Sequence, residues 1–377
     1  MQFRHPRAVV LLFIGIIVVM QAAFWLLPRR SFSENEKRVL SEAPQIDAAG
    51  IADGSVFRSI ESYLSDHFPG RELWVGANAY LENAEGRGAT EDIVRGTDGW
   101  LFTAPVSDDR ETLWDNMQAI TTFVEKQSVP VTMMAVPSAG AVVSGKLPAL
   151  YLPYSDADLL EEARRIAGNT LHWVDLYTDF CSAEQPERLY YRTDHHWTSE
   201  GAYRAYCLLM EELGQSSVPR DDFTVEQISG FYGTSYSKSG LWLTEPDTLE
   251  LWTDPAMQAV TTVYDANRDS VTQEGVFFRE YLKAADKYPV FLSGNHARVH
   301  IETNADSGKR LLVIKDSYAH ALAPFLAEEY STIDLIDLRY FKQQTISSWL
   351  EENPADEILL VYGLGSLAED KNLQWLE

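Results

Sequence analysis

Basic residues are scarce in this 377-residue chain. Only 31 Lys and Arg stand against 56 Asp and Glu, which gives a formal net charge of −25. Phosphate recognition needs clustered cations, so this balance excludes nucleic acid as a partner and disfavours binding to anionic lipid. Neutral glycans and cationic surfaces remain compatible with it.

Cysteine is also scarce. The two cysteines, Cys181 and Cys207, lie on either side of the stretch 191–201. They predict either a disulfide formed outside the cell or two buried thiols. No Cys-x-x-Cys or zinc-finger spacing occurs.

Long uncharged runs are confined to the N-terminus, where residues 8–27 read AVVLLFIGIIVVMQAAFWLL. As a helix this run spans about 30 Å, the thickness of a bilayer core. Two arginines precede it and two follow, so the flanking charge sets no orientation. The run is longer than a signal-peptide core and has no clear small-residue cleavage site. We therefore predict that residues 1–30 form a cytoplasmic stub and a single-pass membrane anchor, with the rest of the chain extracytoplasmic; a cleaved signal peptide is the alternative.

Beyond a polar linker at residues 31–50, segments with helical and strand periodicity alternate. Short apolar runs predict buried parallel strands, chiefly at 129–136, 310–314 and 357–362. Residues 221–305 have little helical periodicity and predict a mainly antiparallel, β-rich insertion with a hairpin around 230–243. The pattern indicates an α/β domain with a parallel sheet over residues 51–377.

A carboxylate and two imidazoles occupy consecutive positions at Asp194, His195 and His196. On an extended segment, Asp194 and His196 leave the chain from the same face. The carboxylate can then orient the His196 imidazole as a general base. Alternatively, Asp194 caps a turn and both histidines are surface residues. His195 is better explained as a structural hydrogen-bonding residue than as a second base.

Ser317 is the best candidate for the nucleophile. It follows the apolar run 311–314 and precedes a helical segment, and sites in open α/β sheets form at the carboxyl ends of strands. The N–H groups of the following helix can help to form an oxyanion hole. A serine also needs a base to remove its proton, and His196 supplies one. Taken alone, Ser317 is better explained as an ordinary helix cap.

Five further residues are weaker candidates for substrate or oxyanion contacts, and His195 is one of them. Trp197 and Tyr318 are suited to stacking on sugar rings, although aromatics beside an apolar motif are more often core residues. Gly294 and Asn295 are candidates for the oxyanion hole because of their turn-like chemistry.

A metal site is a further alternative. Alternation in the strand-like segment 298–301 puts His300 on the same face as His296. Together with His195 and Asp194 these residues offer imidazoles and a carboxylate, which suit Zn²⁺. We nevertheless predict no metal and no cofactor.

The segment Thr193–Trp197 resembles the signature of the DHHW family, bacterial membrane-anchored proteins named for those four letters. Similar pieces extend over most of the extracytoplasmic chain: Ser33–Glu36, Asp66–Arg71, Phe231–Thr234, Phe291–Asn295 and Ile314–Phe325. That family in turn resembles the permuted SGNH-like domains of alginate O-acetylation proteins, in which an Asp-x-His motif precedes a nucleophilic serine. The resemblance implies an SGNH-like fold with Ser317 as nucleophile, His196 as base and Asp194 as the orienting acid.

The resemblance also implies an O-acetyltransferase or esterase that acts on a cell-surface polysaccharide, with a membrane-bound O-acyltransferase as donor partner. The sequence departs from the usual SGNH pattern at two positions. Lys315 occupies the glycine position of the usual Gly-Asp-Ser motif, and the strand ending at Tyr362 and Gly363 has no obvious asparagine for the oxyanion hole. Both favour the alternative of a catalytically degenerate glycan-binding or scaffold protein in an envelope polysaccharide assembly.

Overall fold

The computed structural model describes residues 6–86, 89–90, 92–105, 110–149, 151, 153–267 and 269–377. The chain folds into two compact units. The first contains residues 1–90 together with 237–242, and the second contains residues 91–236 and 243–377.

The first unit begins with α1 (Pro6–Leu26), whose side chains are almost all exposed. Within the described residues, α1 is the one helix long and apolar enough to cross a membrane, with a mean hydropathy of 2.7 over residues 7–26. Its length and composition are compatible with a membrane anchor.

Three short strands and three helices follow in the first unit: β1 (Phe32–Ser33), β2 (Arg38–Val39), α2 (Ala48–Asp53), α3 (Ser55–Asp66), α4 (Arg71–Ala84) and β3 (Ala89–Thr90). Residues of the predicted linker, 31–50, form hydrogen bonds with the end of α3. The Asp66 carboxylate accepts two hydrogen bonds from the Arg38 guanidinium, at 2.5 and 3.0 Å, and two from the amide and hydroxyl of Ser41. Trp242, from the returning segment, donates its indole N–H to the Glu72 carbonyl of α4 at 3.0 Å.

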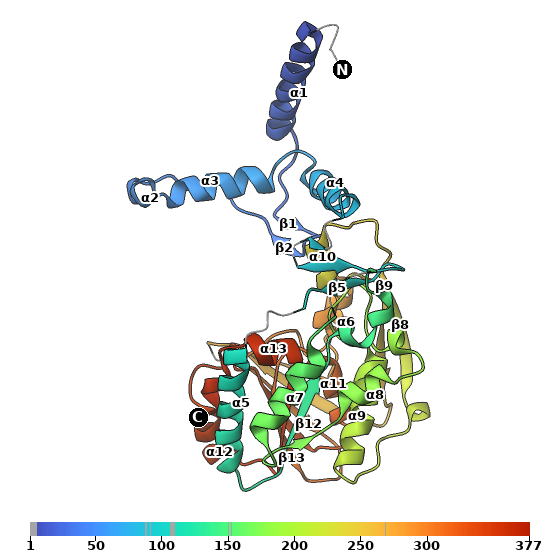
Figure 1. The fold of residues 1–377 in the computed structure, drawn as a ribbon. Helices are drawn as coiled ribbons and strands as arrows, with labels where there is room; N and C mark the ends of the chain where they lie inside the picture. The colour runs from blue at the N-terminus through green and yellow to red at the C-terminus, as the bar shows by residue number, and fades with distance from the viewer. Residues whose placement is uncertain are drawn as a thin grey trace. The chain divides into compact units, whose positions relative to one another are not determined.

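The second unit is built on an eight-stranded sheet in the order β11-β10-β12-β14-β13-β15-β6-β7. Figure 1 labels β12 and β13 of this sheet. The five strands from β14 to β7 are parallel, and β12, β10 and β11 extend that sheet in antiparallel pairing. The strands are β6 (Val131–Val136), β7 (His172–Trp173), β10 (Ala259–Tyr264), β11 (Ser270–Glu274), β12 (Arg298–Thr303), β13 (Arg310–Lys315), β14 (Thr332–Ile336) and β15 (Glu357–Gly363). This mixed sheet confirms the α/β prediction.

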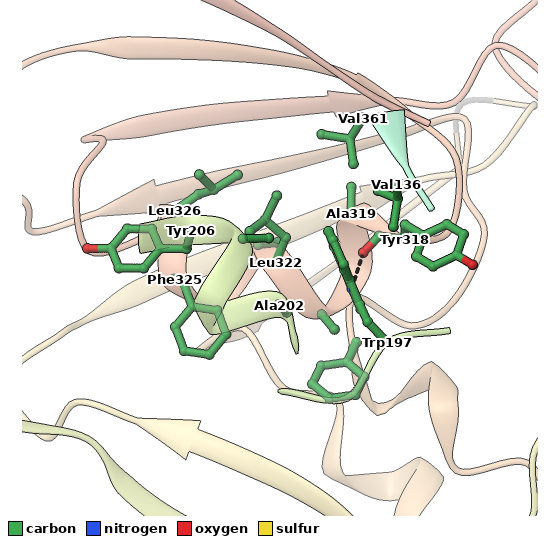
Figure 2. Packing of buried hydrophobic residues seen from close by; sticks show 14 of the residues in the cluster. Val136, Trp197, Ala202, Tyr206, Tyr318, Ala319, Leu322, Phe325, Leu326 and Val361 are labelled. Carbon is green, nitrogen blue, oxygen red and sulfur yellow. Dashed lines mark hydrogen bonds between the residues drawn. The ribbon is translucent and has the colours of Figure 1, made fainter. Parts of the chain in front are cut away.

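Helices build a separate core on each face of the sheet. One core includes α5 (Arg110–Glu125), α7 (Asp156–Ala167), α12 (Ile346–Glu352) and α13 (Leu364–Glu369). The other includes α6 (Ala139–Val142), α8 (Leu176–Cys181), α9 (Ser199–Glu212) and α11 (Ala319–Leu326). Figure 2 shows part of this second core, where Ala202 and Tyr206 of α9 pack beside Leu322 and Phe325 of α11. Thr198 caps α9, because its side chain accepts the Gly201 N–H.

The expected hairpin at 230–243 is wrong. Strand β8 (Thr224–Phe231) pairs instead with β9 (Asp247–Thr253), and α10 (Thr234–Ser239) lies in the connection between them. Gly230 has φ of +74° and lies where the register shifts between Ser229 and Phe231. This glycine therefore marks a bulge rather than a hairpin turn. A short hairpin forms instead between β4 (Ile93–Arg95) and β5 (Leu101–Thr103), where Asp98 and Gly99 both have positive φ.

The cysteine alternatives also need correction. Cys181 and Cys207 are free thiols in the structure, Cys181 exposed and Cys207 half-buried. They form neither a disulfide nor a pair of buried thiols.

Candidate active site

The central motif is a bent loop held by buried hydrogen bonds rather than an extended segment. The Asp247 carboxylate of β9 accepts the Thr193 amide at 2.8 Å and the Thr193 hydroxyl at 2.7 Å. The Asp194 carboxylate accepts the amide N–H of His196 at 2.9 Å, which closes a local turn. Asp194 and His196 therefore meet through this turn and not through strand alternation, so the reason given from the sequence is wrong although the two side chains do meet.

A continuous chain of hydrogen bonds joins the three predicted residues. Ser317 Oγ lies 2.7 Å from His196 Nε2, and His196 Nδ1 lies 2.5 Å from Asp194 Oδ1. Asp194 is 1% exposed and His196 is 4% exposed. The contact between His196 and Ser317 spans 121 positions of the sequence, so the fold alone brings the two motifs together.

Asp194 is held on its second oxygen by Thr234. The Thr234 amide and hydroxyl donate to Asp194 Oδ2 at 2.6 and 3.0 Å. Burial alone raises the pKa of Asp194, but the nearby imidazoles of His196 and His195, with these hydrogen bonds, hold the pKa well below its ordinary value. The carboxylate is therefore charged and oriented at neutral pH. Gly233 makes this approach possible, because a Cβ there would lie 2.2 Å from the Asp194 Cβ.

Ser317 lies in the turn between β13 and α11, at the carboxyl end of a parallel strand. The preceding Asp316 fixes this turn, since its carboxylate accepts the Tyr318 amide at 2.9 Å and the Gly363 amide, at the end of β15, at 2.8 Å. Every residue from 311 to 327 is buried except Ser317. Ser317 is thus the one partly exposed residue of an otherwise buried strand–turn–helix segment.

Tyr288 covers one face of the His196 imidazole. The two rings are stacked, with centroids 4.1 Å apart and planes inclined by 11°. The Tyr288 hydroxyl donates a longer hydrogen bond, 3.4 Å, to the Ser317 carbonyl. Burial raises the pKa of Tyr288 well above its ordinary value, so the phenol is neutral. It restricts the plane of the imidazole without adding charge.

The two aromatic candidates bind the motif loop to the nucleophile turn. The Trp197 indole N–H donates to the Tyr318 carbonyl at 3.0 Å (dashed in Figure 2), and the Tyr318 hydroxyl donates to the His195 carbonyl at 2.8 Å. Trp197 is fully buried and Tyr318 is 7% exposed. These contacts favour the core interpretation over sugar stacking. His195 is partly exposed, and its Nδ1 lies 2.8 Å from the Thr234 hydroxyl, as a structural hydrogen-bonding residue requires.

The two oxyanion-hole candidates, Gly294 and Asn295, form hydrogen bonds with residues outside the triad. The Asn295 side-chain oxygen accepts a hydrogen bond from Arg339 at 3.4 Å, and the Gly294 amide donates to the Phe291 carbonyl at 3.3 Å. Gly294 has φ of +87°. Their role in an oxyanion hole stays a prediction.

Lys315, at the unusual glycine position, is fully buried. Its ammonium lies 2.7 Å from His320 Nε2 and 3.3 Å from an Asp337 oxygen. Asp337 is also paired with Arg339 at 2.6 Å. Burial lowers the pKa of Lys315, and burial together with the Lys315 charge holds the pKa of His320 well below its ordinary value. Lys315 is thus engaged in an internal ion pair.

The metal alternative drawn from the sequence does not assemble. Within the part of the chain that the structure describes, the metal-competent group contains Asp194, His195 and His196, without His296 or His300. His300 Nδ1 is paired with Asp334 at 2.8 Å, and His296 Nε2 lies 3.2 Å from the Ser293 carbonyl. Both ring nitrogens of His196 already have protein partners, which leaves this imidazole poorly suited to a metal.

Residues 171–336 match the DHHW protein family. This segment contains the Asp194–Trp197 signature and Ser317, and the match confirms the predicted resemblance. Among solved structures, the chain is similar to a DHHW family protein from Eubacterium siraeum, with a TM-score of 0.64 and 26% identity; the alignment covers 76% of this chain and 95% of that one.

Two more relatives extend the comparison. The Bacillus cereus PatB1 structure with a sulfonyl adduct aligns with a TM-score of 0.65 at 22% identity, over 76% of this chain and 98% of that one. These structures confirm the predicted SGNH-like α/β fold. The probable alginate O-acetylase AlgJ of Pseudomonas syringae pv. tomato is 27% identical over 203 residues, or 51% of this chain and 48% of AlgJ. The chain spans about half the length of the curated AlgJ relatives that it matches.

Three residues of the site were missed from the sequence. Gly233 and Thr234 lie in the segment 231–234, whose resemblance to the family was the available signal. Tyr288 had no signal, because its stacking on His196 depends on an irregular connection between strands.

Proposed function

We propose that this chain is an SGNH-type O-acyltransferase or esterase in which Ser317, His196 and Asp194 act as nucleophile, base and orienting acid. The observation that carries the proposal is the hydrogen-bond chain from Ser317 Oγ through both nitrogens of His196 to the buried Asp194. General-base activation of a serine needs this order of groups.

In the first half-reaction, Ser317 Oγ attacks the acyl carbonyl while His196 Nε2 takes the hydroxyl proton. A bond forms between Oγ and the carbonyl carbon, and the carbonyl oxygen becomes an oxyanion. The Ser317 amide, before α11, is the donor that we assign to it. The tetrahedral intermediate expels the leaving oxygen, which receives the proton from His196, and an acyl-serine remains.

In the second half-reaction, a hydroxyl group attacks the acyl-serine. His196 removes its proton and returns that proton to Ser317 Oγ as the ester bond breaks. Attack by a glycan hydroxyl gives transfer, and attack by water gives hydrolysis. Asp194 stabilises the imidazolium in both halves because its carboxylate is charged and fixed by Thr234.

Acetyl is the acyl group that we propose, and a cell-surface polysaccharide is the acceptor. The support is the similarity to proteins named as probable alginate O-acetylases. The apolar helix α1 supports retention at the membrane with an extracytoplasmic second unit. A membrane-bound O-acyltransferase that supplies the acyl group is the partner that this arrangement calls for.

The proposal is tested with two readouts on the purified full chain. Hydrolysis of a chromogenic acetyl ester measures turnover. Intact-mass analysis after treatment with an aryl sulfonyl fluoride measures nucleophile reactivity, since an activated serine forms a sulfonate ester with loss of fluoride even where no acceptor is present. Ser317→Ala and His196→Ala are compared with Ser182→Ala, an exposed serine on the same unit.

We expect one sulfonyl group per chain in the native protein and in Ser182→Ala, and none in the other two variants. Ester hydrolysis follows the same pattern if water reaches the acyl-serine. Adduct formation without hydrolysis identifies a strict transferase. A folded native chain that forms no adduct and hydrolyses no ester refutes the enzyme and favours the degenerate scaffold.

A further inference from the structure

The first unit exposes two apolar stripes that its own packing leaves uncovered. On α3, Phe57 and Leu64 are seven residues apart and share one face at about 100° per residue, and Phe68 follows two residues after the helix ends. On α4, Leu73, Trp74 and Leu81 project outward, while Gly76 and Ala79 are buried. These six side chains are 45–72% exposed. Apolar surface on this scale marks an interaction site.

Contacts with the end of α1 fix the position of α3 relative to the bilayer. The Phe24 ring, in the last turn of α1, makes an edge contact with Tyr63 of α3 at 6.4 Å between centroids. The Arg29 guanidinium lies over both rings, 4.0 Å from Phe24 and 5.5 Å from Tyr63. If α1 crosses the membrane, its last turn is at the bilayer boundary, where aromatic and arginine side chains are enriched. Tyr63 and the end of α3 then lie at the same boundary.

The corner between α3 and α4 lies close to the same place. Residues 27–30, directly after α1, and residues 66–73 line one cavity of about 430 Å³. Asp66 at this corner is fixed by Arg38, and Glu36 is paired with Arg71, so the corner is anchored from both sides. Within this unit α3 runs across the direction of α1 (Figure 1). A helix placed so at the end of a membrane span lies along the bilayer surface.

The formal charge of the chain is distributed unevenly between the two units. The first unit has ten Lys and Arg and ten Asp and Glu, so its formal charge is zero, and the second unit carries the whole −25. An anionic bilayer surface repels the second unit and not the first. The charge that disfavours lipid binding for the chain as a whole is thus absent from the part that bears the apolar stripes.

We propose that α3 and α4 form an interfacial element whose apolar stripes, Phe57/Leu64/Phe68 and Leu73/Trp74/Leu81, insert into the outer face of the bilayer that α1 crosses. The occupant of these stripes is lipid, and the driving force is burial of apolar side chains at the headgroup boundary. This inference rests on the proposed retention of α1 as an anchor, and it adds a second, surface-lying contact to the membrane-spanning one.

Site-specific quenching tests the proposal on the full chain in phosphatidylcholine–phosphatidylglycerol vesicles. In a Cys181→Ser, Cys207→Ser background, one cysteine is introduced at a time: Leu64→Cys, Leu81→Cys, the control Ser62→Cys or, within α1, Val18→Cys. Each is labelled with a polarity-sensitive fluorophore. Lipids with a nitroxide near the headgroup then act as quenchers. Ser62 is exposed on the same helix as Leu64 but projects about 160° away from it.

We expect blue-shifted emission and loss of fluorescence at positions 64 and 81, with water-like, unquenched emission at 62. If the probe at 18 responds to membrane lipid but the probes at 64 and 81 behave like 62, the interfacial element is refuted while the anchor stands. Shielding of 64 and 81 only in native membranes, and not in lipid-only vesicles, also refutes it and identifies a protein partner instead. If the probe at 18 stays in water, the anchor itself fails, which separates the two proposals.

Discussion

Asp194→Asn removes one charge and replaces an acceptor oxygen by an N–H₂ group. Asp194 receives four hydrogen bonds, from the amide and Nδ1 of His196 and from the amide and hydroxyl of Thr234. A carboxylate accepts all four, whereas an asparagine places two N–H donors against one of these pairs. If the amide nitrogen faces His196, the imidazole must turn its acceptor nitrogen toward residue 194. Nε2 then carries the proton and no longer accepts one from Ser317.

The size of the loss follows from this tautomer change. In serine–histidine–aspartate sites the same substitution lowers kcat by roughly 10⁴ with little change in geometry. We expect kcat/KM for a chromogenic acetyl ester to fall by about 10³–10⁴, which is about 4–5 kcal/mol of transition-state stabilisation at about 1.4 kcal/mol per tenfold. Thr234→Val is the matched control, because it removes one donor but keeps the charge and the Nδ1 contact.

Steady-state ester hydrolysis by both variants tests the proposed role of Asp194. We expect Thr234→Val to retain most of the activity, because the charged Asp194 carboxylate still orients His196 in this variant. A folded Asp194→Asn protein within about tenfold of native kcat/KM contradicts the proposed roles, since tautomer control alone is worth far more.

The pH dependence of stability gives an independent check on the same residue. The pKa of Asp194 is depressed in the folded state, so its carboxylate stabilises the fold above the unfolded value of about 3.9. That contribution is lost as pH falls through the folded pKa. The difference in urea-unfolding free energy between native chain and Asp194→Asn is therefore expected to be largest at neutral pH and to shrink in acid.

Three more substitutions probe the surroundings of the site. Tyr288→Leu removes the ring stacked on the imidazole and is expected to lower kcat in the ester assay by about tenfold, the effect of losing roughly 1.4 kcal/mol, whereas Tyr288→Phe keeps the ring and most of the activity. Gly233→Ala places a Cβ 2.2 Å from Asp194 and is expected to destabilise the fold by about 1–3 kcal/mol in thermal unfolding; equal stability would contradict the close approach. Lys315→Met removes one partner of a buried ion pair, which typically costs about 3–5 kcal/mol. Because Asp337 keeps Arg339, chemical denaturation should give a value at the lower end of that range.

The sequence was sufficient to predict the elements that have a clear pattern of apolar residues. The parallel strands β6, β13 and β15 are short apolar runs buried on both faces, and a run of this kind has few alternatives in a soluble domain. Helix α7 has a clear helical pattern, because Leu159, Ala163 and Ala167 recur four residues apart and are all buried. Ser317 was predictable for a related reason, since it follows β13 closely, whereas Asp194 and His196 were found from the spacing of their own motif.

What escaped prediction lies in the long connection between α9 and β13. There the turn residues do not identify their own role, because a glycine with positive φ serves a hairpin, a bulge or a cap equally well. Gly230 was assigned to a hairpin and is a bulge. Tyr288 reaches His196 from an irregular segment, and no periodicity specifies such a contact.

The uneven partition of charge has a consequence for how polymers approach the second unit. A body that carries the entire −25 repels any polyanion in solution, and mobile ions screen that repulsion beyond about 10 Å at 0.1 M ionic strength. Association with a uronic-acid polymer is therefore accelerated by added salt, whereas association with an uncharged glycan is indifferent to it. Ionic strength thus becomes a means of sorting acceptor polymers by their charge before any of them has been chemically identified.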